Sequence, residues 1–138
     1  MTERFDTPHL HWQLRVRPGD APPWGEIAAG LDDLEQSIRT IILTPPGSVA
    51  LEPEKFCAAL DYIDRPPAVA IPMITREIFD ALSRWEPRIE LAEPVQVEML
   101  EFHRFRAVIA WRPRADVLAD IIRTEVFLAA GEDGRLAA

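Results

Sequence analysis

The chain has 138 residues, of which 48% are hydrophobic and 28% are charged, and its formal net charge at pH 7 is −8. This length and balance are typical of a single folded domain, expected over residues 1–138, and they exclude a disordered chain. The negative charge argues against nucleic acid as a partner, because affinity for phosphates depends on clusters of Lys and Arg.

The N-terminal region, residues 1–30, is predicted to form one strand followed by a loop. The apolar residues Leu10, Trp12, Leu14 and Val16 each have a polar residue between them. This alternation predicts a strand whose apolar face is buried. Pro18 and Gly19 end the strand, and Trp24 in the following loop is expected to pin that loop to the core.

Two main helices are predicted in the middle of the chain. Apolar residues recur at three- and four-residue steps in both, first at Leu31, Leu34, Ile38, Ile41 and Ile42, then at Ile71, Ile74, Ile78, Leu82 and Trp85. Acidic residues lie near the positive end of the first helix, at Asp32, Asp33 and Glu35. Pro72 is expected in the first turn of the second helix. Between them, residues 54–63 are expected to form a brief helix that Pro66 and Pro67 end.

The last third of the chain is predicted to form an antiparallel hairpin and a third strand. The alternating residues are Val95, Val97 and Met99, then Phe105, Ala107, Ile109 and Trp111, then Thr124, Val126 and Leu128. Residues 112–119 are interpreted as a connection, and residues 129–138 as a flexible tail. The fold class expected is therefore α+β, with two main helices packed on a mostly antiparallel sheet.

A charged corner is predicted where the second helix meets the next strand. Pro87 prevents the helix from continuing and favours an extended backbone at Glu86, so the chain turns sharply. Glu86 and Arg88 then either pair with each other or present a carboxylate and a guanidinium to another protein. The spacing alone favours the local pair, and both interpretations stay open at this point.

Three segments resemble the baseplate protein W, or gene-25-like, family of contractile phage tails. Residues 36–47 (QSIRTIILTPPG) are similar to the end of the family's first helix, and residues 84–89 (RWEPRI) are similar to its helix-to-strand junction. Phe56 and residues 61–66 (DYIDRP) resemble the variant found in Mu-like phages. The similarity covers residues 31–128. Cys57 stands where the family has Gly, which bears on the loop conformation because Gly admits positive φ and Cys resists it.

The resemblance implies a gene-25-like fold for residues 31–128 and a structural, non-enzymatic role in the tail baseplate of a virion, assembled in the host cytoplasm. It implies several copies around the tail's sixfold axis, in contact with other wedge proteins, the sheath protein, and hub, spike or tail tube proteins. The resemblance also implies that the chain docks on the wedge through Glu86, Pro87 and Arg88, with Trp85 beside them. Charge reversal at Arg88 is expected to leave the domain folded and to abolish wedge assembly.

The resemblance also implies that the strands named above offer a template for the sheath, which grows by strand addition. The candidate positions are the ten alternating residues from Val95 to Leu128. The alternative interpretation is an ordinary sheet buried within one domain. A further alternative for the whole chain is the equivalent subunit of a type VI secretion system or another contractile injection machine.

A tail lysozyme is the remaining alternative, because some members of the family carry that label. Glycoside hydrolysis needs two carboxyl groups, one of them protonated. Glu86 lies beside a large aromatic residue, but Arg88 is expected to keep it ionised. Ser37, Ser48 and Ser83 lie in no nucleophile motif. We therefore expect no enzymatic activity.

No cofactor and no metal are expected. His9, His11 and His103 have no acidic residue at ligand spacing, so solvated side chains are the preferred interpretation. Cys57 is the sole cysteine, which excludes a disulfide within the chain. No apolar run approaches the roughly 20 residues of a membrane-spanning helix, so no membrane is expected as a partner.

Overall fold

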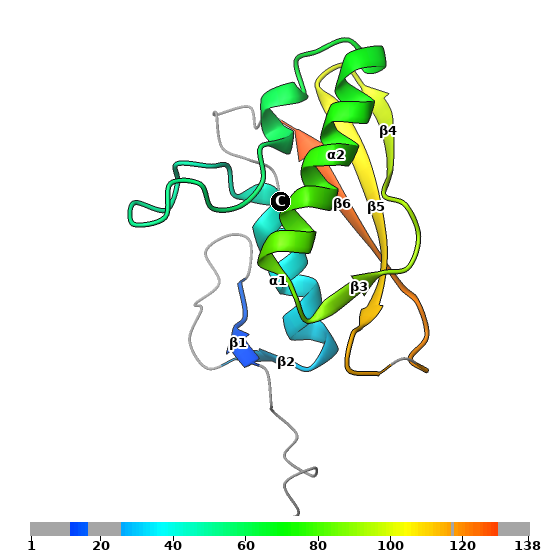
Figure 1. Ribbon diagram of the computed structural model, residues 1–138. Helices are drawn as coiled ribbons and strands as arrows, with labels where there is room; N and C mark the ends of the chain where they lie inside the picture. The colour runs from blue at the N-terminus through cyan, green and yellow to red at the C-terminus, as the bar shows by residue number, and fades with distance from the viewer. Residues whose placement is uncertain (1–11, 17–25, 117, 130–138) are drawn as a thin grey trace, which may run out of the picture.

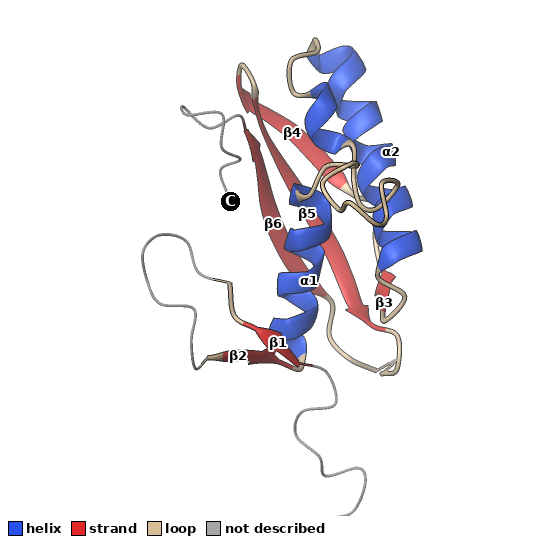
Figure 2. Cartoon of the chain, turned by 90° about the vertical axis from the view of Figure 1, so that its left-hand side faces the viewer, coloured by secondary structure: helices blue, strands red, loops and turns tan. Residues whose placement is uncertain are grey.

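The computed structural model describes residues 12–16, 26–116 and 118–129 (Figure 1). In chain order its elements are β1 (Trp12–Leu14), β2 (Ile27–Ala29), α1 (Leu31–Leu43), the 3-10 turn η2 (Ala59–Tyr62), α2 (Pro67–Trp85), β3 (Ile89–Leu91), β4 (Gln96–Glu101), β5 (Arg104–Pro113) and β6 (Ile122–Ala129). The two α-helices lie on the same face of the larger sheet, with α1 near β6 and α2 near β4 (Figure 2). The predicted α+β class is confirmed.

The large sheet is antiparallel and has β5 at its centre. β6 pairs with β5 over residues 104–111. β3 and β4 both lie on the opposite edge of β5, β3 beside residues 111–113 and β4 beside residues 104–108. The predicted hairpin and third strand correspond to β4, β5 and β6, and β3 is the strand into which the charged corner leads.

The helices form largely where the periodicity predicts, with two corrections. α2 begins at Pro67, so Pro72 lies inside the helix and not in its first turn as expected. Pro67 fits this start because the first N–H of a helix has no intrahelical partner. The helix predicted over residues 54–63 is only the short turn η2. Its shortness has a local cause, because Phe56 adopts a φ of 86°, which is incompatible with a right-handed helix.

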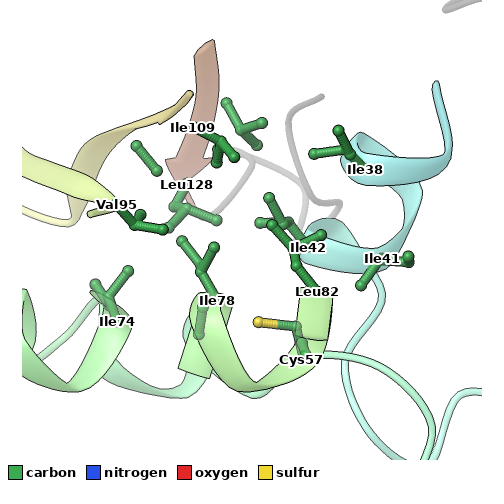
Figure 3. Packing of buried hydrophobic residues seen from close by; sticks show 14 of the residues in the cluster. Ile38, Ile41, Ile42, Cys57, Ile74, Ile78, Leu82, Val95, Ile109 and Leu128 are labelled. Carbon is green, nitrogen blue, oxygen red and sulfur yellow. The ribbon is translucent and has the colours of Figure 1, made fainter. Parts of the chain in front are cut away.

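The core lies between the helices and the sheet (Figure 3). It includes Ile38 and Ile42 from α1, Ile74 and Ile78 from α2, and the alternating residues of β5 and β6. Cys57 is fully buried among them, and burial raises the pKa of its thiol to about 11. The thiol is therefore protonated at neutral pH, which fits a core residue and not a nucleophile.

The N-terminal strand differs from its prediction. Trp12, Leu14 and Val16 are exposed, whereas Ala28 on the paired strand β2 is fully buried. The inward contact is polar, because the Gln13 side-chain amide donates to the Asp33 carbonyl at 2.8 Å. The expectation of a buried apolar face is therefore wrong for the described part of this strand. Leu10 and Trp24 lie outside the described residues, as does the predicted tail apart from Ala129.

Within residues 12–16, 26–116 and 118–129, no helix combines the length and the apolar character needed to cross a bilayer.

Candidate functional site

The charged corner forms a sharp turn, as the sequence predicts. The Glu86 backbone N–H still donates to the Leu82 carbonyl of α2 at 3.1 Å, and the φ and ψ of Glu86 are −125° and 75°. Pro87 follows, which ends the helical bonding pattern. Three residues after Glu86 the chain is already in β3. The bend therefore takes the chain directly from α2 onto the sheet.

Four side chains meet inside this bend, namely Asp33, Ser37, Glu86 and Arg88, and we call them the corner network. Arg88 donates to both oxygens of Glu86, from Nε to Oε1 at 2.7 Å and from Nη2 to Oε2 at 2.9 Å. Its Nη1 donates to Asp33 Oδ2 at 2.9 Å. The Ser37 hydroxyl donates to Glu86 Oε2 at 2.5 Å. Glu86 and Asp33 are each only 3% exposed, so one guanidinium joins two buried carboxylates.

The electrostatics of the network keep both partners of the corner charged. Burial alone would raise the pKa of Glu86, but the hydrogen bonds from Arg88 and Ser37 outweigh it and lower that pKa below its ordinary value. The hydrogen bond to Glu86 raises the pKa of Arg88. Glu86 is therefore an ionised carboxylate at neutral pH, as expected from the proximity of Arg88.

The network joins the two sequence segments that resemble the gene-25-like family. Ser37 belongs to the first segment and Glu86 to the second, 49 positions apart. Neighbouring polar residues of the first segment also bond to distant backbone. The Gln36 amide accepts from the Val16 N–H and donates to the Leu14 carbonyl, and Arg39 donates to the Glu125 carbonyl of β6 at 2.7 Å. Each of these side chains fixes α1 to another element.

Asp33 and Ser37 were missed as members of the site by sequence reasoning. Asp33 was interpreted only as an acid that favours the positive end of the first helix, but it is also buried and paired with Arg88. Ser37 was considered only as a nucleophile. The signal that would have found them is the position of polar residues beside the apolar stripe of α1, because a buried polar group needs a partner.

An aromatic cluster lies on the outer side of the corner. The rings of Phe56 and Trp85 meet edge to face, with centroids 6.1 Å apart. The guanidinium carbon Cζ of Arg84 lies 4.6 Å from the centre of the Trp85 ring, and Nζ of Lys55 lies 5.7 Å from it. Phe56 holds its left-handed φ of 86°, a strained conformation for a bulky residue. Cys57 is not among the described residues with positive φ, so its replacement of the family's Gly causes no strain at that position.

An open cleft of about 360 Å³ runs along this corner. Its lining includes Gln13, Thr40, Phe56, Trp85, Pro87 and Arg88. Among the candidate docking residues, Pro87 is exposed, Trp85 is half-buried, the Arg88 side chain is 32% exposed, and Glu86 is buried. The local pair is therefore the correct interpretation of Glu86 itself. The accessible part of the candidate site consists of Pro87, Trp85 and the outer edge of Arg88.

The candidate sheath-facing strands differ in how accessible their backbones are. β5, with Phe105, Ala107, Ile109 and Trp111, has neighbours on both sides over residues 104–108, so a further strand cannot pair with it there. β4, with Val97 and Met99, and β6, with Thr124, Val126 and Leu128, each have one outer edge in the described sheet. Val95 precedes β4 and is buried.

The remaining candidates do not come together. His103 Nδ1 lies 2.8 Å from Asp64 Oδ1, a single contact between the β4–β5 turn and the turn that precedes α2. Among the described residues, no group of three or more metal-ligating side chains is assembled. His9 and His11 lie outside the described residues.

A solved protein of Geobacter sulfurreducens, named "putative tail lysozyme", is similar to this chain. The two are 28% identical, the match covers 71% of this chain and 90% of that chain, and the TM-score is 0.59. The chain has a gene-25-like fold. No protein-family model matches the chain, and no curated protein matches it.

Replacement of Arg88 by Met is expected to destabilise the fold, because it leaves Glu86 and Asp33 as buried carboxylates without a counterion. The expected loss is about 3 kcal/mol in the free energy of unfolding, the lower end of the range for broken buried pairs, since solvent reaches part of Arg88. Arg76→Met is the matched control, because its pair with Asp80 is exposed and should contribute less than about 1 kcal/mol. Urea unfolding followed by circular dichroism measures both. Equal losses would contradict the bridging role of Arg88.

The stability contribution of Glu86 is expected to depend on pH. Its pKa is lowered in the folded state from an ordinary value of 4.5. The contribution is therefore complete above that value and is lost as the pH falls through the folded-state pKa. The difference in unfolding free energy between the wild type and Glu86→Gln should be largest near pH 7 and shrink below about pH 4.5. A difference that stays constant down to pH 3 would argue against this linkage.

Proposed function

We propose that the chain is a structural subunit of the baseplate of a contractile phage tail, which docks on other wedge proteins through its corner. The similarity to a protein named as a tail lysozyme supports a tail-associated role. The observation that carries the proposal is the corner network, in which Ser37 of one family-like segment bonds to Glu86 of the other. The segments that carry the resemblance thus form one structural unit at one end of α2.

In this proposal Glu86 and Arg88 position the docking surface and Pro87 and Trp85 form it. The bidentate pair and the bond to Asp33 hold the bend rigid, so Pro87 is presented at a fixed place. A rigid surface loses less conformational entropy on binding than a mobile one. The strained Phe56 supports Trp85 from the side, which is consistent with strain being retained at binding sites.

Sheath assembly is proposed to begin at the outer edges of β4 or β6, by addition of a strand from the sheath protein. At the β6 edge one carbonyl is not free to pair with an added strand, because Arg39 already donates to the Glu125 carbonyl. Several copies around the sixfold axis of the tail would present such edges as a ring. Hub, spike or tail tube proteins are further proposed neighbours, and the equivalent subunit of a type VI secretion system is the alternative that neighbouring genes would decide.

We propose no enzymatic activity, although the name of the Geobacter protein keeps a lysozyme as the second candidate. Glu86 lines the cleft but is only 3% exposed, and it is an ionised carboxylate that accepts three side-chain hydrogen bonds. A general acid must instead be protonated and reach the substrate. Asp33, the nearest acid in the network, is equally buried and paired. These carboxylates are bound to a guanidinium that occupies the space between them.

Substitution of Pro87 by Glu is expected to impair docking while the domain stays folded. Pro87 is exposed, so its loss should change the unfolding free energy by about 1 kcal/mol at most, whereas a charge at the interface opposes binding. Complete baseplates, counted by electron microscopy after complementation, should fall at least tenfold. Ser83→Glu, also exposed and four positions earlier, is the control. Normal particles from the folded Pro87→Glu variant would remove the docking claim.

A zymogram separates the two candidate functions. The purified wild-type chain is expected to give no clearing of peptidoglycan after refolding in the gel. Clearing by the wild type that disappears in Glu86→Gln, with the variant still folded by circular dichroism, would replace the structural role with a hydrolase. Clearing that persists in the variant would place the activity elsewhere in the chain.

A further inference from the structure

β3 and β4 are two parts of one interrupted edge strand of the large sheet. β3 ends at Leu91 and β4 begins at Gln96, and both pair with β5. The Ala92 N–H still bonds to β5, so residues 93–95 stand opposite a single residue of that strand. Such a bulge ends regular pairing, and Pro94 within it has no N–H to offer an added strand. β4, with six residues, is therefore the longer uninterrupted part of this edge.

The register shows which backbone groups of β4 face the open edge. In an antiparallel pair the N–H and C=O groups of one residue point to the same side, and this side alternates along the strand. The Ala92 N–H donates to the Ala110 carbonyl, so the even-numbered residues of β5 face this edge, and their partners in β4 are also even-numbered. Val97 and Met99 therefore point their N–H and C=O groups outward, where the described sheet has no further strand.

The opposite edge of the sheet, formed by β6, is partly occupied. By the same alternation the even-numbered residues of β6 bond to β5 and the odd-numbered ones point outward. The Glu125 carbonyl agrees with this direction, because it accepts from Arg39 of α1 at 2.7 Å. A strand added along β6 would have to displace that bond. The two edges are therefore not equivalent, and β4 is the better acceptor of a strand.

α2 carries an exposed apolar stripe beside the β4 edge. Val69, Pro72 and Phe79 lie off the core stripe of this helix and share one face, since three and seven positions separate them. All three are exposed, Val69 at 49% and Phe79 at 52%. Pro72 and Phe79 line a groove of about 570 Å³ that has Leu91 and Val95 on its other side. Because Val95 directly precedes β4 and α2 packs on that strand, the groove lies at the open edge (Figure 1).

The free backbone edge and the apolar groove together indicate an extended occupant. A helix placed on the stripe would bond its own backbone groups internally. It would cover the outward groups of Val97 and Met99 without bonding to them, which costs free energy. A strand added to β4 bonds to these groups and turns every second side chain toward α2. One extended segment therefore satisfies both features.

A second copy of this chain is a poor occupant of the edge. The two-fold pairing that bonds both Val97 and Met99 of each copy places Glu98 directly opposite its own counterpart. Like charges in that position destabilise a strand pair, whereas opposite charges stabilise it. Glu98 lies on the face of the sheet away from the helices, where it pairs with Arg106. The favoured residue opposite Glu98 is therefore a Lys or Arg of a different protein.

We propose that the outer edge of β4 and the exposed stripe of α2 together accept one extended segment of another tail protein. The residues of this segment opposite Val97 and Met99 are apolar and pack beside Phe79, and the residue opposite Glu98 is Lys or Arg. The inference rests on the proposed function and deepens it. It selects β4 over β6 as the edge for strand addition, and it gives the added strand a stated order of side chains.

Photo-crosslinking in assembled particles tests where the segment lies. p-Benzoylphenylalanine replaces Phe79 in one full-length variant and Arg84, beside the corner, in another. Irradiated particles are digested and the crosslinked peptides are identified by mass spectrometry. The expected result at position 79 is a crosslink to another tail protein, in a segment where a Lys or Arg separates two apolar residues.

Other crosslinks overturn the inference in distinguishable ways. Crosslinks from position 79 only to a second copy, or only to the same chain, exclude a strand from another protein. A partner at position 84 with none at position 79 also overturns the inference and leaves the proposed docking at the corner standing. If neither position reaches another tail protein, the inference and the proposed function both fail.

Backbone methylation of the mapped peptide distinguishes a strand from a helix. Two synthetic peptides carry N-methyl groups on alternate residues, one on the odd-numbered set and one on the even-numbered set. An edge strand bonds to β4 through one set only, so one peptide should bind the full chain at least tenfold more weakly and the other less than threefold. A helix uses the amides of both sets. Equal losses in calorimetric titration would therefore overturn the inference.

Substitution of Phe79 locates the peptide on the chain. Phe79→Ser is expected to weaken binding of the unmethylated peptide about tenfold, because it removes the largest exposed apolar side chain of the groove. Leu31→Ser is the matched control, since Leu31 is also 52% exposed but lies on α1, and the affinity should change less than twofold. Equal affinities for the wild type and Phe79→Ser would contradict the placement beside α2.

Discussion

The bridge from Arg88 to two buried carboxylates is the interaction on which the arrangement of this chain depends. Asp33 comes from the first turn of α1, Glu86 from the end of α2, and Arg88 leads into β3. Removing charge from water is costly unless every charge is paired. The three elements can therefore satisfy these groups only in one relative placement. Arg114 extends the restraint to the end of β5, with its N–H on the Arg88 carbonyl and its Nε on the Pro87 carbonyl.

This bridge also explains why Arg88 is a poor site for testing partner binding. Charge reversal there was expected to leave the domain folded, but it would place a third acid beside two buried carboxylates. The shape of the corner and its accessible surface therefore depend on different residues. Glu86 and Arg88 set its shape from inside, and Pro87 and Trp85 give it a surface. Substitutions that distinguish docking from folding must be made on that surface.

The sequence predicted the elements whose signal is local and missed what depends on distant contacts. The stripes of α1 and α2 and the alternation in β4, β5 and β6 are short-range patterns, and the helices and strands lie where these patterns indicate. The pairing of Glu86 with Arg88 could be foreseen as one of two open interpretations because the two residues lie only two positions apart. Asp33 lies 55 positions from Arg88, and no spacing rule connects them. The positive φ of Phe56 likewise could not be predicted from its residue type, because bulky residues rarely adopt it.

The error in the prediction for β1 has a different cause. Alternation establishes that a strand has an apolar face, but it does not establish what covers that face. In this chain polar bonds from Gln13 and Gln36 turn the apolar face away from the core. Asp33 bonds to both regions, since its carbonyl accepts from Gln13 and its carboxylate accepts from Arg88. The hairpin and the corner therefore both bond to one residue at the start of α1, so the first turn of this helix fixes their placement relative to each other.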